Sequence, residues 1–112
     1  MAVFVSNIVI EQGFDFDTIF TLEDIGTNNL LNLTGYNIAA QLRKTYSSSS
    51  SVSFASTILS PTEGSIQISL TASETVDLKP GRYVYDVKLT SSGGSVTKPI
   101  EGSALVRAGV TR

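Results

Sequence analysis

The sequence predicts an all-β fold, an antiparallel β-sandwich of about seven strands. Three observations support this prediction. Apolar and polar residues alternate with a period of two in most segments, as they do in strands that bury one face. Turn residues separate these segments at the roughly 8-to-12-residue spacing typical of a sandwich. A single short stretch suits a helix. At 112 residues, we expect positions 1–112 to form one domain with one core.

The strands are expected where the alternation is clearest. They fall at residues 7–11, 14–22, 36–43, 52–59, 66–70, 82–90 and 96–106, of which 52–59 is the weakest. In the second of them Phe14, Phe16 and Phe20 share one face, which indicates a half-buried strand. The last contains Pro99, which has no N–H to donate to a ladder, so we expect a bulge there and an edge position.

Two connecting segments have a distinctive composition. Residues 47–51 are five serines in a row, which cannot bury apolar surface, so we expect an exposed loop. Residues 71–78 are the helical exception and predict one short helical turn. Thr71 and Glu74 have capping-box spacing there, and we expect Ala72, Val76 and Leu78 to face the core.

The segment 78–83, Leu-Lys-Pro-Gly-Arg-Tyr, resembles the tyrosine corner of immunoglobulin-like domains. In such a corner the hydroxyl of a tyrosine, here Tyr83, donates a hydrogen bond to the backbone a few residues upstream. The sequence therefore predicts an immunoglobulin-like sandwich, with a compact barrel as the alternative.

Side chains that carry chemistry are scarce. The chain has no histidine and no cysteine, which removes the commonest general base, the thiolate nucleophile and the commonest transition-metal ligands. Asp15 and Asp17 share a strand face and suggest a calcium site, but a solvated face is the favoured interpretation because no EF-hand-type loop accompanies them. We expect no enzyme, no cofactor, no metal and no catalytic residue, and no binding residue is assigned.

Charge and hydropathy limit the classes of partner. The eight basic residues are scattered along a chain of net charge −2, so we expect no nucleic-acid partner. No apolar stretch approaches the roughly 20 residues that a membrane helix needs, so we expect no membrane partner. Most aromatic residues alternate along strands and are expected in the core, whereas Tyr46, beside the serine run, is expected to be exposed.

Three stretches, taken in order, resemble one family. They are 10–16 (IEQGFDF), 33–36 with 41–43 (LTGY and QLR), and 70–75 (LTASET) continuing through 81–87 (GRYVYDV) to 101–102. This order resembles short phage tail and baseplate proteins and the N-terminal domain of phage upper-baseplate proteins. The whole sequence is also similar to small virion structural proteins of contractile-tailed phages that infect marine cyanobacteria.

The resemblance implies an immunoglobulin-like or baseplate-type sandwich that docks onto other virion proteins, in several copies within a symmetric assembly. We therefore expect a non-enzymatic structural protein located in the virion, at the tail or baseplate, with edge strands near the N-terminus and near Pro99 as the docking surface. A capsid decoration protein of the same fold is one alternative. A carbohydrate-binding host-recognition module that uses Tyr46 is the other.

Overall fold

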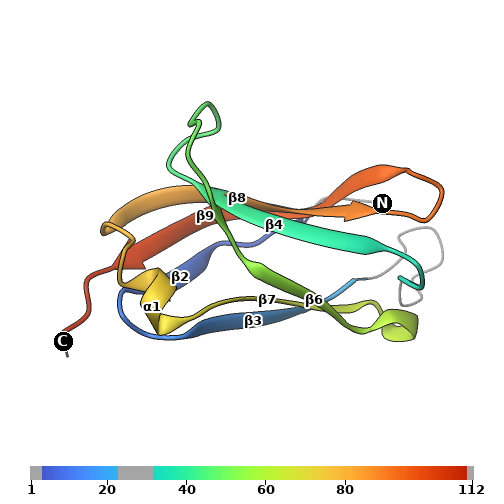
Figure 1. Ribbon diagram of the computed structural model, residues 1–112, viewed down its shortest axis with the longest axis horizontal. Coiled ribbons are helices and arrows are strands. Elements are labelled where there is room, and N and C mark those ends of the chain that lie inside the picture. Colours follow the sequence, from blue (N-terminus) through green and yellow to red (C-terminus); the bar gives the residue numbers. More distant parts are fainter. Residues whose placement is uncertain (1–3, 23–31, 111–112) are drawn as a thin grey trace.

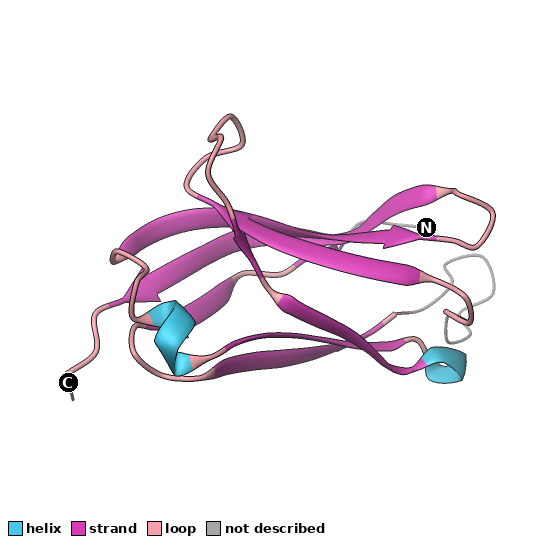
Figure 2. Cartoon of the chain, in the orientation of Figure 1, coloured by secondary structure: helices cyan, strands magenta, loops and turns pink. Residues whose placement is uncertain are grey.

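The computed structural model describes residues 4–22 and 32–110, and two β-sheets stacked as two layers dominate it (Figures 1 and 2). The first sheet has the order β1-β9-β8-β4-β5, and β2 also pairs with β9. The second has the order β3-β7-β6. The strands are β1 (Phe4–Val5), β2 (Ile8–Glu11), β3 (Phe16–Thr21), β4 (Asn37–Arg43), β5 (Val52–Ser53), β6 (Ala55–Ser60), β7 (Ser65–Leu70), β8 (Gly81–Thr90) and β9 (Val96–Arg107). The expected all-β sandwich is confirmed.

The core fills the space between the two layers, and the period-two pattern explains which side chains enter it. Alternate residues of β7 and β8 are buried, while their neighbours face outward. Phe54 joins the layers, because its ring lies 6.1 Å from the rings of both Phe16 and Tyr85. The largest fully buried aliphatic side chains are Ile10, Leu33, Leu42, Ile66, Ile68, Val87, Leu89, Ile100 and Val106.

The N-terminal strands differ from the antiparallel expectation. Both β1 and β2 run parallel to β9, with Phe4 opposite Ile100 and Ile8 opposite Ala104. Between them the ladder is interrupted at Ser6 and Asn7, where the side chain of Asn7 accepts the hydrogen bond that the backbone N–H of Ser103 donates (3.1 Å). A tight hairpin can join only antiparallel strands, and the parallel neighbours β2 and β9 are accordingly separated in the chain by strands β3 to β8.

The expectation that the Pro99 strand lies at an edge is wrong for most of its length. From Ile100 onward β9 pairs with β8 on one side and with β1 and β2 on the other. The predicted irregularity is present: the β8–β9 register shifts between Val87, opposite Ile100, and Leu89, opposite Thr97. A bulge at this point accommodates the missing N–H of proline.

The tyrosine corner forms as predicted. The hydroxyl of Tyr83 donates a 2.8 Å hydrogen bond to the carbonyl oxygen of Lys79, four residues upstream. Lys44 lies above the same ring, with its Nζ 4.7 Å from the ring centroid, which is a cation–π distance. This corner fixes the chain where it passes from α1 into β8.

Two short helical elements are present, η1 (Pro61–Glu63) and α1 (Ala72–Thr75). The predicted capping box is confirmed, since the Thr71 N–H donates a 2.9 Å hydrogen bond to the Glu74 carboxylate. Leu78 is buried as expected, but Val76 is 52% exposed, contrary to the prediction. The helix is too short to turn Val76 inward, and Thr75 occupies the core-facing position instead.

Candidate functional site

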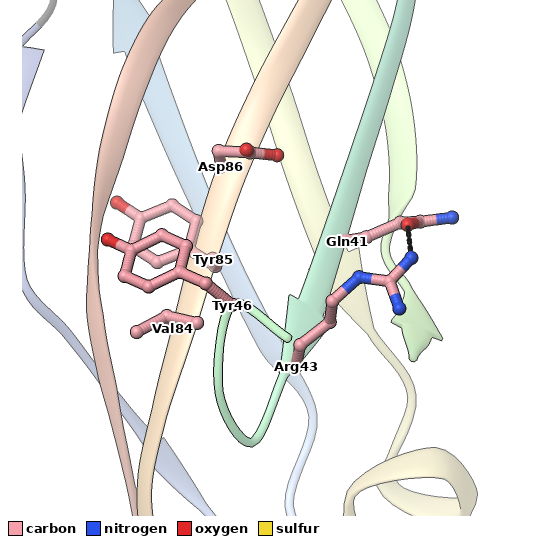
Figure 3. Close-up of a pocket in the computed structure, with 6 residues that line it drawn as sticks. All are labelled: Gln41, Arg43, Tyr46, Val84, Tyr85 and Asp86. Atoms are coloured by element: carbon pink, nitrogen blue, oxygen red, sulfur yellow. Dashed lines mark hydrogen bonds between the residues drawn. The ribbon is translucent and has the colours of Figure 1, made fainter. Parts of the chain in front are cut away.

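A groove lies on the outer face of the first sheet, where β4 and β8 run side by side (Figure 3). Its volume is about 260 Å³. We call it the Tyr46 groove, and its lining residues are Gln41, Arg43, Tyr46, Val84, Tyr85 and Asp86. Its lining combines an aromatic ring, a guanidinium, an amide and a carboxylate.

Strand register brings these side chains together. Gln41 lies opposite Asp86 and Arg43 lies opposite Val84 in the antiparallel β4–β8 ladder. Residues paired directly across two strands point to the same face. The inward neighbours Ala40 and Leu42 are buried, so these four residues form the outer face.

Tyr46 reaches the groove from the loop between β4 and β5, which projects from the body of the sandwich (Figure 1). Its side chain is 72% exposed. Arg43 holds the loop, because its guanidinium donates a 2.7 Å hydrogen bond to the Ser48 carbonyl. The same guanidinium donates a 3.1 Å hydrogen bond to the Gln41 amide oxygen (Figure 3). A turn closed by the Ser48 N–H and the Thr45 carbonyl (3.1 Å) adds to this support.

The charges of the groove are mixed. Asp86 lies opposite Gln41 on one side and opposite Glu101 on the other, and a like-charged pair at that spacing is unfavourable. Lys98 compensates, since its Nζ lies 3.7 Å from the Asp86 carboxylate. The groove therefore offers the Asp86 carboxylate and the Gln41 amide for hydrogen bonding beside the Tyr46 ring, and Lys98 lies next to it as the partner of Asp86.

A second hollow, of about 540 Å³, borders the same loop. The tyrosine-corner residues Lys79 and Tyr83 line it, together with Lys44 and Val52. The projecting loop therefore borders two hollows, the Tyr46 groove and the hollow beside the tyrosine corner.

Of the two aspartates considered as a calcium site, Asp15 and Asp17, the first has a structural role. The carboxylate of Asp15 accepts a 2.7 Å hydrogen bond from the backbone N–H of Ala72, in the first turn of α1. Asp17 lies apart from it, exposed on the outer face of β3. Across residues 4–22 and 32–110, histidine, cysteine, aspartate and glutamate side chains do not cluster in threes that could hold a metal ion. In the same ranges, no helix has the length and hydropathy to cross a membrane.

Most aromatic residues lie where the alternation predicted, and Phe14 is an exception. Tyr85 is buried, and burial raises the pKa of its phenol above 10.0. Tyr36 and Tyr83 pack against the core, whereas Phe14 is 39% exposed because it precedes β3. The exposure of Tyr46 was foreseen from its serine-rich neighbours, but the groove below it was not, because the pairing of residue 41 with residue 86 is not visible in the sequence.

Comparison with known proteins gives little beyond this description. No family model matches the chain, and no curated protein sequence matches it. Among solved structures, an internalin-like protein of Listeria monocytogenes aligns with 92% of this chain at 16% identity and a TM-score of 0.46. A family 123 glycoside hydrolase from Clostridium perfringens aligns with 96% at 15% identity and a TM-score of 0.44. The chain spans only 27% and 24% of those two proteins.

Proposed function

We propose that this chain is a non-enzymatic structural component of a tailed-phage particle, where it docks onto neighbouring tail or baseplate subunits. The resemblance of residues 10–16, 33–43 and 70–102 to tail and baseplate proteins supports the location. The absence of histidine and cysteine from the sequence supports a role without catalysis. The surface proposed here for docking is the Tyr46 groove and its loop, in place of the edge strands near the N-terminus and near Pro99 that the sequence suggested.

The observation that carries the proposal is that Tyr46 is exposed on a loop held in place by Arg43. Tyr46 is 72% exposed in the projecting loop between β4 and β5, and Arg43 holds that loop through hydrogen bonds to Ser48 and Gln41. Tyrosine and arginine are enriched among the residues that dominate binding energy at protein interfaces. A loop backbone that is already held in place loses less entropy when a partner covers it, so an aromatic side chain on such a loop suits a docking contact.

A cryo-electron-microscopy map of the intact particle, with copies of the chain located and counted, tests the proposal. Density at the tail or baseplate, with Tyr46 against another protein, is the expected result. A lattice of copies over the capsid would replace the proposal with a decoration role. Absence of the chain from purified particles would overturn both.

A second candidate function has one observation in its favour. An exposed aromatic ring beside a carboxylate and an amide, here Tyr46 with Asp86 and Gln41, is also suited to stacking on a sugar and binding its hydroxyl groups. A glycan-array screen, followed by a nuclear magnetic resonance titration with any saccharide that binds, tests this role. Binding that is lost in Tyr46→Ala and kept in Thr62→Ala would favour it, and no binding on the array would exclude the saccharides tested.

A further inference from the structure

The outer edge of β3 is an exposed sheet edge whose single charged residue, Asp17, is its main protection. β3 is the terminal strand of the β3-β7-β6 sheet, and none of the strands in the described ranges pairs with its far side. Native edges are blunted by lysine, proline or bulges. The six residues of β3, FDTIFT, include no lysine or proline, and the β3–β7 register runs without a shift. The opposite edge strand, β6, is bulged between Ile58 and Ser60.

The direction of the backbone groups on this edge follows from one hydrogen bond. The N–H of Leu22 donates to the carbonyl of Gly64, toward β7 (2.9 Å). The N–H and C=O groups of successive residues alternate between the two sides of a strand. The even-numbered residues of β3 therefore direct these groups toward β7, and the odd-numbered residues direct them toward the open edge. The free N–H and C=O groups of the edge are therefore those of Asp17, Ile19 and Thr21.

The side chains of the same three residues point to the outer face, and they complement a second copy of themselves. If β3 pairs antiparallel with β3 of another copy about a two-fold axis through Ile19, then Ile19 lies opposite Ile19 and Asp17 lies opposite Thr21. The apolar side chain that is 56% exposed in the single chain is then covered by its own counterpart. The charged residue faces a hydroxyl donor and not another carboxylate, so like charges do not oppose each other.

We propose that a second copy of this chain binds the β3 edge, forming an antiparallel two-fold pair in which the two three-stranded sheets become one continuous sheet. About six main-chain hydrogen bonds would join the copies. This inference goes beyond the proposed function, because it concerns the isolated chain and stands or falls without a particle.

The pairing is weak for two free molecules. Two short strands bury much less than the roughly 1,000 Å² of a stable interface. Association is therefore expected only at high protein concentration, on the order of hundreds of micromolar. In an assembly that holds copies side by side, the effective local concentration reaches the millimolar range and the same edge contact becomes favourable.

Sedimentation velocity over a concentration series up to about 1 mM, with amide hydrogen exchange at both ends of the series, tests the proposal. A dimer is expected to form with rising concentration. Protection of the Asp17, Ile19 and Thr21 amides is expected to rise at least several-fold with it, while the amides of Ser56 and Ile58 on β6 stay unchanged. A chain that remains monomeric throughout, or a dimer without added protection at β3, would overturn the proposal.

Substitutions test the register. Ile19→Lys places two ammonium groups opposite each other, and it is expected to weaken dimerisation at least tenfold. Leu59→Lys on β6, also at an exposed apolar position of the same sheet, is the matched control and is expected to leave dimerisation unchanged. A stronger effect of Leu59→Lys than of Ile19→Lys would place the interface on β6 and contradict the proposal.

A substitution that adds an attractive charge pair is expected to strengthen dimerisation. Thr21→Lys places an ammonium opposite Asp17 of the second copy, so dimerisation is expected to tighten several-fold. Adding Asp17→Ala is expected to remove that gain. Unchanged dimerisation in Thr21→Lys, in a variant whose thermal melt shows a folded protein, would contradict the antiparallel register.

Discussion

The hydroxyl of Tyr85 donates a 2.6 Å hydrogen bond to the carbonyl oxygen of Ser6, 79 residues earlier in the chain. The bond passes over Gly102, the β9 residue that pairs with Tyr85. Ser6 is the point at which the N-terminal strand is interrupted, and its N–H donates to the Glu101 carbonyl (2.9 Å). The buried phenol of Tyr85 thus holds the backbone at Ser6, between β1 and β2, against β8 in the middle of the sheet.

Removing this phenol is expected to destabilise the protein. In Tyr85→Phe the Ser6 carbonyl loses its donor, and the free energy of unfolding should fall by about 1–2 kcal/mol. Urea unfolding measures the change. Tyr36→Phe is the matched control, since no hydrogen bond joins the Tyr36 hydroxyl to another described residue, and its effect should lie within about 0.5 kcal/mol. Equal losses in the two variants would contradict the role given to the Ser6 bond.

The same phenol makes stability depend on alkaline pH. Burial raises the pKa of Tyr85 in the folded protein above its ordinary value of 10.0. Below pH 10 the phenol is protonated in both states, and its contribution to stability is fully present. As pH rises past 10 the unfolded chain releases this proton first, so the folded state loses stability until its own pKa is passed. The difference in unfolding free energy between wild type and Tyr85→Phe should shrink through this window, and a constant difference would contradict the raised pKa.

Gly102 is required because the N-terminal strand passes directly over it. A Cβ atom at this position would overlap the carbonyl oxygen of Ser6 and approach the Tyr85 ring at 3.2 Å. Gly102→Ala should therefore cost about 1–3 kcal/mol and increase hydrogen exchange at Ile8 and Ile10. The control Gly93→Ala meets nothing closer than 3.9 Å and should be near neutral. Unchanged protection of β2 in Gly102→Ala would contradict the close approach.

Thr75 is a buried polar residue that ties α1 to the turn between β2 and β3. Its Oγ1 accepts a 3.0 Å hydrogen bond from the Gly13 N–H and donates a 2.8 Å hydrogen bond to the Phe14 carbonyl. Thr75→Val keeps the shape but leaves both backbone groups without a partner, so a loss of about 2 kcal/mol is expected in thermal unfolding. Thr57→Val, at an exposed position of β6, should change stability by less than about 0.5 kcal/mol.

Local patterns predicted much of this fold. The inward faces of β4, β7 and β8 follow from alternation, because each side chain's direction depends only on its position in the strand. The tyrosine corner at Tyr83 and the capping box of Thr71 and Glu74 were also visible, since each closes within a few residues.

The features that were missed depend on contacts between distant residues. The hydrogen bond between Asn7 and Ser103 joins residues 96 apart, and nothing near Asn7 in the sequence indicates it. Threonine is a residue type that is mostly exposed, and the burial of Thr75 depends on its hydrogen bonds to the turn at Gly13 and Phe14. The Tyr46 groove likewise requires the β4–β8 register. The strand that contains Pro99 was placed at an edge because the parallel pairing of β1 and β2 with β9, from Ile100 onward, was not foreseen.

Photocrosslinking in the intact particle tests the docking account most directly. Position 46 is replaced by the photoreactive aromatic p-benzoylphenylalanine, with the exposed η1 residue Thr62 replaced in the same way as a control. Under the proposed function the chain is part of a tailed-phage particle, so particles purified from a culture of that phage are irradiated and the products are identified by mass spectrometry. The account predicts a crosslink from position 46, and not from position 62, to a tail or baseplate protein. Particles that contain the chain but give no crosslink from position 46, or particles that lack the chain, would contradict it.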